Sequence, residues 1–223
     1  MQIKDLKKIS YPDAMQIMDD LHAARVQNKV PDTILVLEHH PVITKGRRLD
    51  GTPIPNEGKI RARGITICQT DRGGLLTYHA PGQIVLYFIL RLTDSFRGIS
   101  ELVAALEAGI QEFLSNLGVE AQIKKDHPGI WVGERKVASL GLRVADGVTK
   151  HGIALNVSND MSAYALFDPC GLTGNTMTNL EDMLARKITA EELAEMKIKL
   201  TQVMHSQFFQ CDTNHGQSPE SRS

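Results

Sequence analysis

A cysteine in a turn is the residue of this chain best suited to nucleophilic chemistry. In the segment FDPCGL, Cys170 lies between Pro169 and Gly171, two residue types that favour a turn and expose the side chain between them. An accessible thiol becomes a nucleophile when a nearby cation or dipole favours the thiolate. Cys68, within the apolar segment ITICQT, and Cys211 are more typical of structural thiols. Cys170 is therefore the candidate nucleophile, with a structural role as the alternative.

A lysine and a histidine are the next candidates. Lys136 follows a turn at Gly133 and Glu134 and, taken alone, is typical of a solvated turn lysine. His79 lies in RGGLLTYHAPGQIVLY, residues 72–87, where glycines allow the backbone to come close to a ligand. This histidine can fix the loop by hydrogen bonding or contact a substrate, and the sequence alone supports both roles equally.

Metal and nucleotide sites are disfavoured by the spacing of these residue types. The three cysteines are far apart without a CxxC pair, and the histidines form no HxH or HExxH motif. The sequence has no GxxxxGK[ST] motif, and the glycines of residues 72–82 do not fit GxGxxG. We therefore expect neither a metal ion nor a cofactor.

The composition is typical of one compact domain. The 223 residues are 42% hydrophobic, and the net charge of −1 indicates no general attraction to nucleic acid or to anionic membranes. The longest apolar run, IVLYFIL, is far shorter than the roughly 20 residues of a membrane-spanning helix, and the N-terminus lacks signal-peptide features. We expect a cytoplasmic monomer with one domain over residues 1–212 and a polar, disordered tail over residues 213–223.

Hydrophobic periodicity predicts helices over residues 11–27, 100–117 and 190–208. Ser100 is expected to cap the second helix, and Thr189 with Glu192 has the spacing of a capping box at the start of the third.

Strands are predicted at residues 34–38, 65–70 and 84–92, and the last of these is apolar on both faces and therefore central. Three more strands between residues 129 and 157 form a meander with turns at 133–134 and 146–147. Residues 39–48 and 50–64 are predicted as loops. These elements indicate an α/β fold of the α+β type, a mixed β-sheet flanked by helices.

Four segments together resemble one enzyme family. RGG, TYH and GQ within residues 72–87, PGIWVGERKVASLGLRV, HGIALNVSNDMSAY and DPCGL occur in the order found in the lipoyl(octanoyl) transferases, over roughly residues 30–185. The family's usual HGPGQ is HAPGQ here, and Ala80 affects only the local backbone. The resemblance implies a fold similar to the catalytic domain of biotin and lipoate protein ligases.

The resemblance also implies site residues. It places the family's nucleophilic cysteine on Cys170 and its lysine on Lys136, as a catalytic dyad. We expect Tyr78 and His79 to form one wall of the site, and Leu140, Leu142 and Ile153 to line a groove for an acyl chain. The implied substrate contacts are Arg72, Gly73, Gly74, Leu75, Leu76, Thr77, Tyr78, His79, Ser139, Leu140, Gly141, Gly152, Ile153 and Ala154.

The implied reaction moves an octanoyl group from octanoyl-acyl carrier protein to a lysine of a lipoyl domain, through a thioester on Cys170. The implied acceptors are the lipoyl domains of 2-oxoacid dehydrogenases and the glycine cleavage H protein. Three alternatives stay open: an ATP-dependent lipoate or biotin protein ligase, a non-catalytic binding homologue, and a thioesterase using Cys170 with His79 or His151. The presence of both Cys170 and Lys136 favours the transferase.

Residues 45–72 carry a local excess of positive charge, with seven basic residues against three acidic ones. Because acyl carrier proteins and lipoyl domains are typically acidic, we expect this segment to attract both partners, with a solvated loop as the alternative. The basic residues are Lys45, Arg47, Arg48, Lys59, Arg61, Arg63 and Arg72.

Overall fold

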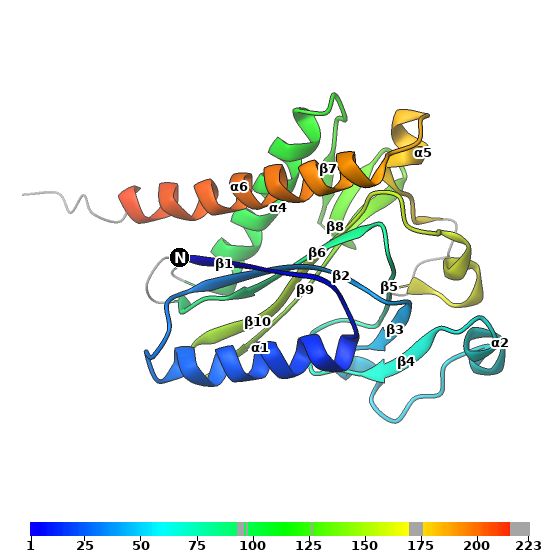
Figure 1. The fold of residues 1–223 in the computed structure, drawn as a ribbon, viewed down its shortest axis with the longest axis horizontal. Helices are drawn as coiled ribbons and strands as arrows, with labels where there is room; N and C mark the ends of the chain where they lie inside the picture. The colour runs from blue at the N-terminus through cyan, green and yellow to red at the C-terminus, as the bar shows by residue number, and fades with distance from the viewer. Residues whose placement is uncertain (93–95, 97, 126, 170–175, 215–223) are drawn as a thin grey trace, which may run out of the picture.

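The computed structural model describes residues 1–92, 96, 98–125, 127–169 and 176–214 (Figure 1). Most strands belong to a seven-stranded sheet: β1 (Gln2–Ile9), β2 (Thr33–His39), β6 (Gln83–Ile89), β7 (Gln122–Lys124), β8 (His127–Val132), β9 (Arg135–Ala145) and β10 (Val148–Asn156). Their order across the sheet is β1-β2-β6-β10-β9-β8-β7. β1 runs parallel to β2 and the other pairs are antiparallel, so the sheet is mixed, as predicted.

A three-stranded sheet lies beside the larger one. It consists of β3 (Val42–Lys45), β4 (Thr66–Gln69) and β5 (Leu76–His79), in the order β4-β3-β5. The short helix α2 (Glu57–Ala62) and the 3-10 turn η2 (Ser162–Leu166) lie against each other at this side of the molecule (Figure 1). Ile43, Tyr78 and Tyr164 belong to the buried cluster that holds this region together.

Three helices cover the two faces of the larger sheet. α4 (Ile99–Ser115) and α6 (Ala190–Asn214) pack on one face, and α1 (Tyr11–Val26) packs on the other (Figure 1). β6 is buried on both faces, as its apolar sequence predicts. It places Ile84, Leu86 and Phe88 against α4 and α6, and Val85, Tyr87 and Ile89 on the side of α1.

The three predicted helices and the meander of β8, β9 and β10 are confirmed. The capping box of α6 is present, because Thr189 Oγ1 accepts from the Glu192 N–H and Glu192 accepts from the Thr189 N–H. The predicted cap of α4 is wrong. This helix begins at Ile99 after Gly98, so Ser100 lies inside its first turn and no side chain caps it.

Two predicted loops contain regular structure, and the strands β1, β5 and β7 were not predicted. Residues 42–45 form β3 despite the flanking Pro41 and Gly46, and residues 57–62 form α2. β1 gives no strand signal in the sequence, because it is a charged edge strand that depends on pairing with β2. Helix α6 continues into the predicted tail as far as Asn214, and residues 215–223 lie outside the described part of the chain.

Within the described residues, no helix combines the length and the apolar character needed to cross a membrane.

Candidate active site

A pocket lies between the larger sheet and the strand β5, on the side of α1. We call it the central pocket. Its floor is formed by β9 and β10, where Gly141 pairs with Gly152 and Ser139 pairs with Ala154. Because opposed residues of an antiparallel pair share a face, these small side chains leave open space above the sheet. The lining residues are Tyr11, Arg72, Thr77, His79, Tyr87, Ser139, Leu140, Gly141, His151, Gly152, Ile153 and Ala154.

The strand β5 separates the residues predicted to contact the substrate. Thr77 and His79 line the central pocket, whereas Leu76 and Tyr78 belong to the buried cluster of the smaller sheet. Successive side chains of a strand point to opposite faces, so Tyr78 and His79 do not form one wall, contrary to expectation. Tyr78 packs instead edge-on against Tyr164.

Arg72 lines the central pocket, but its guanidinium is engaged by the protein itself. It donates to the carbonyl oxygens of Thr44, Gly73 and Leu75 at 2.8–2.9 Å, and it also donates to the Thr44 hydroxyl. Arg72 therefore fixes the 72–75 loop. Since it is buried, it cannot belong to the surface that the sequence predicted to attract acidic partners.

The remaining predicted contacts lie outside the central pocket. Gly73 and Gly74 line a neighbouring hollow, together with Leu142, which was expected in the acyl groove. The Leu75 carbonyl accepts hydrogen bonds from Arg72 and from the Gly46 N–H. Leu140 and Ile153, the other expected groove residues, do line the central pocket.

An uncharged set of buried side chains, which we call the neutral network, surrounds one side of the central pocket. Its members are His79, Gln83, Asn156, Asn159 and Thr178. The Gln83 amide nitrogen donates to the Tyr78 carbonyl and to Asn156 Oδ1, so Gln83 Oε1 is the acceptor that lies 2.7 Å from His79 Nδ1. Nδ1 of His79 therefore carries the proton. Burial lowers the pKa of His79 well below its usual value and keeps the ring neutral.

The neutral network continues to the main chain beside Lys136. Asn156 donates to the Thr178 carbonyl at 2.9 Å and accepts from Asn159 at 3.1 Å. The Thr178 N–H in turn donates to the Lys136 carbonyl at 3.0 Å. One chain of hydrogen bonds thus connects the wall of the central pocket to the strand that carries Lys136.

The tyrosines of the central pocket point their hydroxyls away from it. Tyr11 donates to Thr70 Oγ1 at 2.8 Å, and Tyr87 lies 2.8 Å from His39 Nε2. Burial raises the pKa of Tyr11 to about 12 and lowers that of His39 to about 4, so both rings stay uncharged. The His39 Nδ1–H donates to the Ile9 carbonyl, which leaves Nε2 to accept from Tyr87. The pocket therefore presents ring carbons to a ligand.

A group of charged residues, which we call the ionic cluster, lies at the end of the central pocket where His151 is found. Asp71 accepts from His151 Nε2 at 2.5 Å, from Arg143 at 2.6 Å and from Lys150 at 2.8 Å. These bonds, led by that from His151, hold the pKa of Asp71 well below its usual range. His151 is itself buried at a φ of +62°, a conformation that costs free energy in a residue with a side chain.

Lys136 is buried, and its side chain occupies space that is free only because residue 129 is a glycine. Its ammonium donates to the Pro128 carbonyl at 2.5 Å and lies 6.0 Å from the centre of the Trp131 ring. Gly129 has a φ of +131°, and a Cβ atom there would collide with Lys136 Cε and with the Ala138 carbonyl. The expectation of a solvated turn lysine does not hold, since the side chain is enclosed by β8 and β9.

Cys170 lies outside the described residues, but its flanking segments are described. Phe167 before it and Met177 after it belong to the same buried cluster. Met177 also forms a β-bridge with Lys136. The segments on both sides of Cys170 are thus anchored in the same buried cluster, and the second of them lies beside Lys136.

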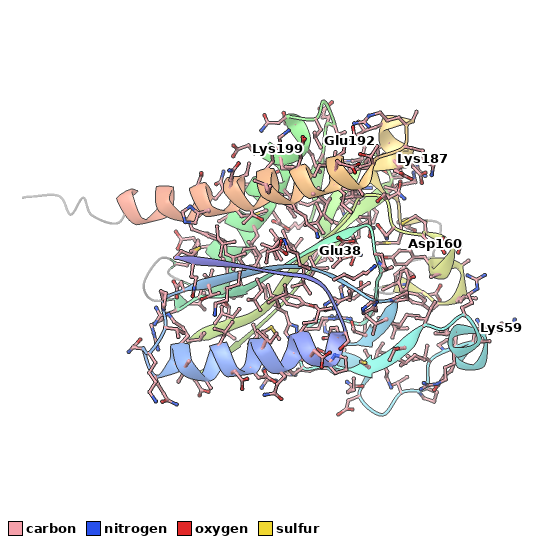
Figure 2. All side chains as sticks on the ribbon, in the orientation of Figure 1. Glu38, Lys59, Asp160, Lys187, Glu192 and Lys199 are labelled. Carbon is pink, nitrogen blue, oxygen red and sulfur yellow. The ribbon has the colours of Figure 1, made fainter. Side chains whose placement is uncertain are left out.

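A hydrogen bond from a turn also ties α6 to the site. The Gly82 N–H donates to Glu38 on β2, and the other carboxylate oxygen of Glu38 pairs with Lys197 of α6 at 2.7 Å. Glu38 lies between the sheet and α6 (Figure 2). The turn that follows His79 is therefore anchored to the helical layer.

The sequence analysis did not predict three residues that line the central pocket: Tyr11, Tyr87 and His151. Tyr11 begins a helix and gives no local signal, whereas Tyr87 and His151 are next to or within motifs that carry the family resemblance.

Within the described residues, no group of three His, Cys, Asp or Glu side chains is arranged to hold a metal ion.

The fold is shared with protein ligases. The bi-partite lipoate protein ligase of Thermoplasma acidophilum has a TM-score of 0.64 at 14% identity, covering 96% of this chain and 90% of the ligase. The biotin protein ligase of Aquifex aeolicus has a TM-score of 0.52 at 13% identity, covering 96% of this chain and 71% of the ligase. These likenesses define the class of fold, as the sequence predicted.

Sequence comparison narrows this class. The model of the lipoyl protein ligase A/B catalytic domain matches residues 10–200, and the chain belongs to that family. The octanoyltransferase of Dechloromonas aromatica (strain RCB) is 38% identical over 193 residues, which are 86% of this chain and 91% of the relative. The predicted resemblance is confirmed, and the chain is an acyltransferase that transfers octanoyl groups.

Proposed function

We propose that the octanoyl group passes from octanoyl-acyl carrier protein to a lysine of a lipoyl domain through a thioester on Cys170. The observation that carries this proposal is the attachment of the segment after Cys170 to Lys136, through the Met177 bridge and the Thr178 hydrogen bond. This attachment favours a position of Cys170 close to the lysine ammonium, where the cation stabilises a thiolate.

In the first half of the reaction, the Cys170 thiolate attacks the thioester carbon of the donor. The bond from this carbon to the phosphopantetheine sulfur breaks, and Lys136 gives its proton to the departing thiolate. The products are octanoyl-Cys170, a free carrier-protein thiol and a neutral Lys136. One thioester is exchanged for another, so the step needs no ATP.

In the second half, the amine of the acceptor lysine attacks the octanoyl-Cys170 carbonyl. The Cys170 thiolate leaves, an amide forms, and Lys136 takes the proton that the amine loses. Cysteine and lysine return to their starting charges. Arginine could supply the positive charge of Lys136 but could not release its proton at neutral pH.

The central pocket suits the acyl chain in this scheme. Its floor carries small residues, and its two tyrosine hydroxyls form hydrogen bonds away from the cavity. Leu140 and Ile153 alternate with these small residues along β9 and β10, and their side chains belong to the core on the side of α4 and α6. A pocket that presents ring and aliphatic carbons binds an alkyl chain through the hydrophobic effect.

The proposed partners are octanoyl-acyl carrier protein and the lipoyl domains of 2-oxoacid dehydrogenases and the glycine cleavage H protein. We place the reaction in the cytoplasm. We also propose a monomer as the active form.

A basic surface near η2 is the proposed docking region for these partners. Lys59, Arg61 and Arg63 are exposed on or just after α2, and Arg63 contacts Ser162 of η2, a few residues before Cys170. Lys59 lies at the outer edge of this region (Figure 2). Because the partners are typically acidic, these charges would increase the rate of encounter.

The test is intact-mass analysis after mixing the protein with octanoyl-acyl carrier protein, followed by addition of a lipoyl domain. We expect a hydroxylamine-sensitive octanoyl adduct in the natural protein, no such adduct in Cys170→Ser, and transfer of the octanoyl group to the lipoyl domain. A requirement for ATP and free octanoate would reject the proposal in favour of a ligase. Release of octanoate without a lipoyl domain would indicate a thioesterase.

A further inference from the structure

The depth of the central pocket can be measured along β9, starting from Lys136. Gly129 lies against both Lys136 Cε and Nζ, and also against the Ala138 carbonyl. The lysine side chain therefore extends along β9, and its ammonium lies level with Ala138, immediately before Ser139. Under the proposed function the thioester lies at this level, so we take the pair of Ser139 and Ala154 as the reacting end of the pocket.

The opposite end of the pocket is at His151. In the register of β9 and β10, Ser139 pairs with Ala154, Gly141 with Gly152, and Leu142 with His151. His151 lines the pocket at this last level, where its ring contacts Tyr87 edge-on. The floor therefore runs from Ser139 to the level of Leu142, three residues along the strand.

This length matches one acyl chain. Three strand residues span about 10 Å at about 3.3 Å per residue. An extended chain of eight carbons spans about 9 Å, given C–C bonds of about 1.5 Å at tetrahedral angles. A chain two carbons longer would reach the ring of His151.

The ring of His151 is held firmly enough to act as an end wall. Its Nε2 donates to Asp71, its backbone N–H contacts Met18 Sδ, and its backbone is in the left-handed region. Asp71 is in turn held by Arg143 and Lys150, and Lys150 also pairs with Asp19. Moving the ring aside would break this ionic cluster.

We infer that His151, supported by Asp71, closes the central pocket at the depth of an eight-carbon chain and so determines the acyl chain length that the enzyme accepts. This inference rests on the proposed function, because it places the thioester at Lys136. Its role is in specificity, since His151 meets the methyl end of the chain and not the reacting carbon.

Two substitutions change the pocket length in opposite directions. His151→Asn shortens the wall residue, and asparagine tolerates the positive φ at this position. Gly141→Ala adds a methyl group to the floor, where its Cβ would make ordinary contacts with Arg72 Cδ at 3.4 Å and the Gly73 carbonyl at 3.5 Å. The alanine therefore fills space without a clash.

Arg143→Gln is the matched control. Arg143 binds Asp71 but does not line the central pocket, and Asp71 keeps its bonds to His151 and Lys150. This substitution alters the ionic cluster without changing the length of the pocket.

The experiment measures kcat/KM with hexanoyl-, octanoyl- and decanoyl-acyl carrier protein. We expect the natural protein to prefer octanoyl over decanoyl by about tenfold or more, the selectivity that extra methylenes typically give. His151→Asn should remove this preference, Gly141→Ala should shift the optimum to hexanoyl, and Arg143→Gln should keep the natural ratios. An unchanged octanoyl to decanoyl ratio in His151→Asn, or an equal change in Arg143→Gln, would overturn the inference.

Binding of free hexanoate, octanoate and decanoate, measured by thermal shift, separates this inference from the proposed function. If the natural protein transfers no octanoyl group, the proposed function fails. The inference is still supported if octanoate binds more tightly than decanoate and His151→Asn removes that difference. It is overturned if the natural protein binds both acids equally.

Discussion

The neutral network and the ionic cluster border the same pocket but differ in charge and in exposure. The members of the neutral network are at most 6% exposed, and the network ends at the main chain of Lys136. The ionic cluster lies at the opposite end, and the side chain of Asp71 is 31% exposed. Hydrogen bonds between uncharged groups thus surround the end where we propose the reaction, and ion pairs occur where solvent reaches them.

This difference follows from the cost of burying charge. A buried ion needs a partner and several hydrogen bonds to replace its hydration, whereas neutral amides need only hydrogen bonds. A fixed charge close to Lys136 would also change the balance between ammonium and thiolate on which the proposed chemistry depends. Separation of the two clusters keeps the lysine and the incoming cysteine as the main charges at the reacting end.

The largest expected effect comes from removing the charge at the reacting end. Lys136→Met keeps the length of the side chain but cannot transfer a proton, so we expect octanoyl transfer to fall by about 10²–10⁴-fold. Lys136→Arg should fall similarly, because arginine keeps its proton. Octanoate binding by thermal shift serves as the control for folding, and transfer at the natural rate by Lys136→Met would contradict the role of Lys136.

The next effect compares isosteric substitutions in the two clusters. Asn156→Asp puts a carboxylate against the Thr178 carbonyl in a fully buried site, and we expect a loss of about 3–5 kcal/mol in the free energy of unfolding. Asp71→Asn removes a charge from a partly exposed site and should cost about 1–2 kcal/mol near pH 7. Urea denaturation measures both. Equal losses of unfolding free energy in the two variants would show that the neutral network does not exclude charge more strongly than the ionic cluster.

A pH titration of stability sharpens the same comparison. The pKa of Asp71 is lower in the folded protein than its unfolded value of about 3.9, so its contribution is complete above about pH 5 and is lost as the pH falls below about 4. The difference in unfolding free energy between the natural protein and Asp71→Asn should therefore shrink as the pH falls below about 4. A difference that grows as the pH falls from about 4 to about 3 would have the wrong sign.

The smallest effect concerns the surface beyond both clusters. Reversing Arg61 and Arg63 to Glu should raise the KM for acyl carrier protein several-fold at low salt and flatten its salt dependence, because surface charges act mainly on encounter. The control carries the same change in charge at Lys29, just after α1, and at Lys199 on α6. Unchanged kinetics in the Arg61/Arg63 variant would leave these residues as ordinary solvated charges.

The sequence predicts the elements that carry their own pattern. α4 and α6 show helical periodicity, β6 is continuously apolar, and the turns of the meander contain glycine, so all of these were predicted correctly. β1 and β3 could not be predicted, because each is stabilised by strands distant in sequence. The charged residues of β1 and the short length of β3 are also common in loops, so the local sequence does not identify either segment as a strand.

The site was predictable to a similar degree. Arg72, Thr77, His79 and the small residues of β9 and β10 lie in motifs, and the structure brings them together around the central pocket. The sequence cannot reveal that the Arg72 guanidinium donates to backbone carbonyl groups or that Tyr78 packs in the cluster of the smaller sheet. Nor can it reveal the hydrogen bond between Asp71 and His151. These facts depend on strand register and on contacts between segments that lie far apart along the chain.

The outward orientation of the two tyrosine hydroxyls around the central pocket has a calorimetric consequence. Water beside these rings finds few hydrogen-bond partners, because the hydroxyls of Tyr11 and Tyr87 already form hydrogen bonds elsewhere. Displacement of this poorly bonded water by an alkyl chain returns it to bulk solvent with a gain in enthalpy. Fatty-acid binding should therefore be exothermic at 25 °C, and its heat capacity change should become more negative with each methylene until the pocket is full.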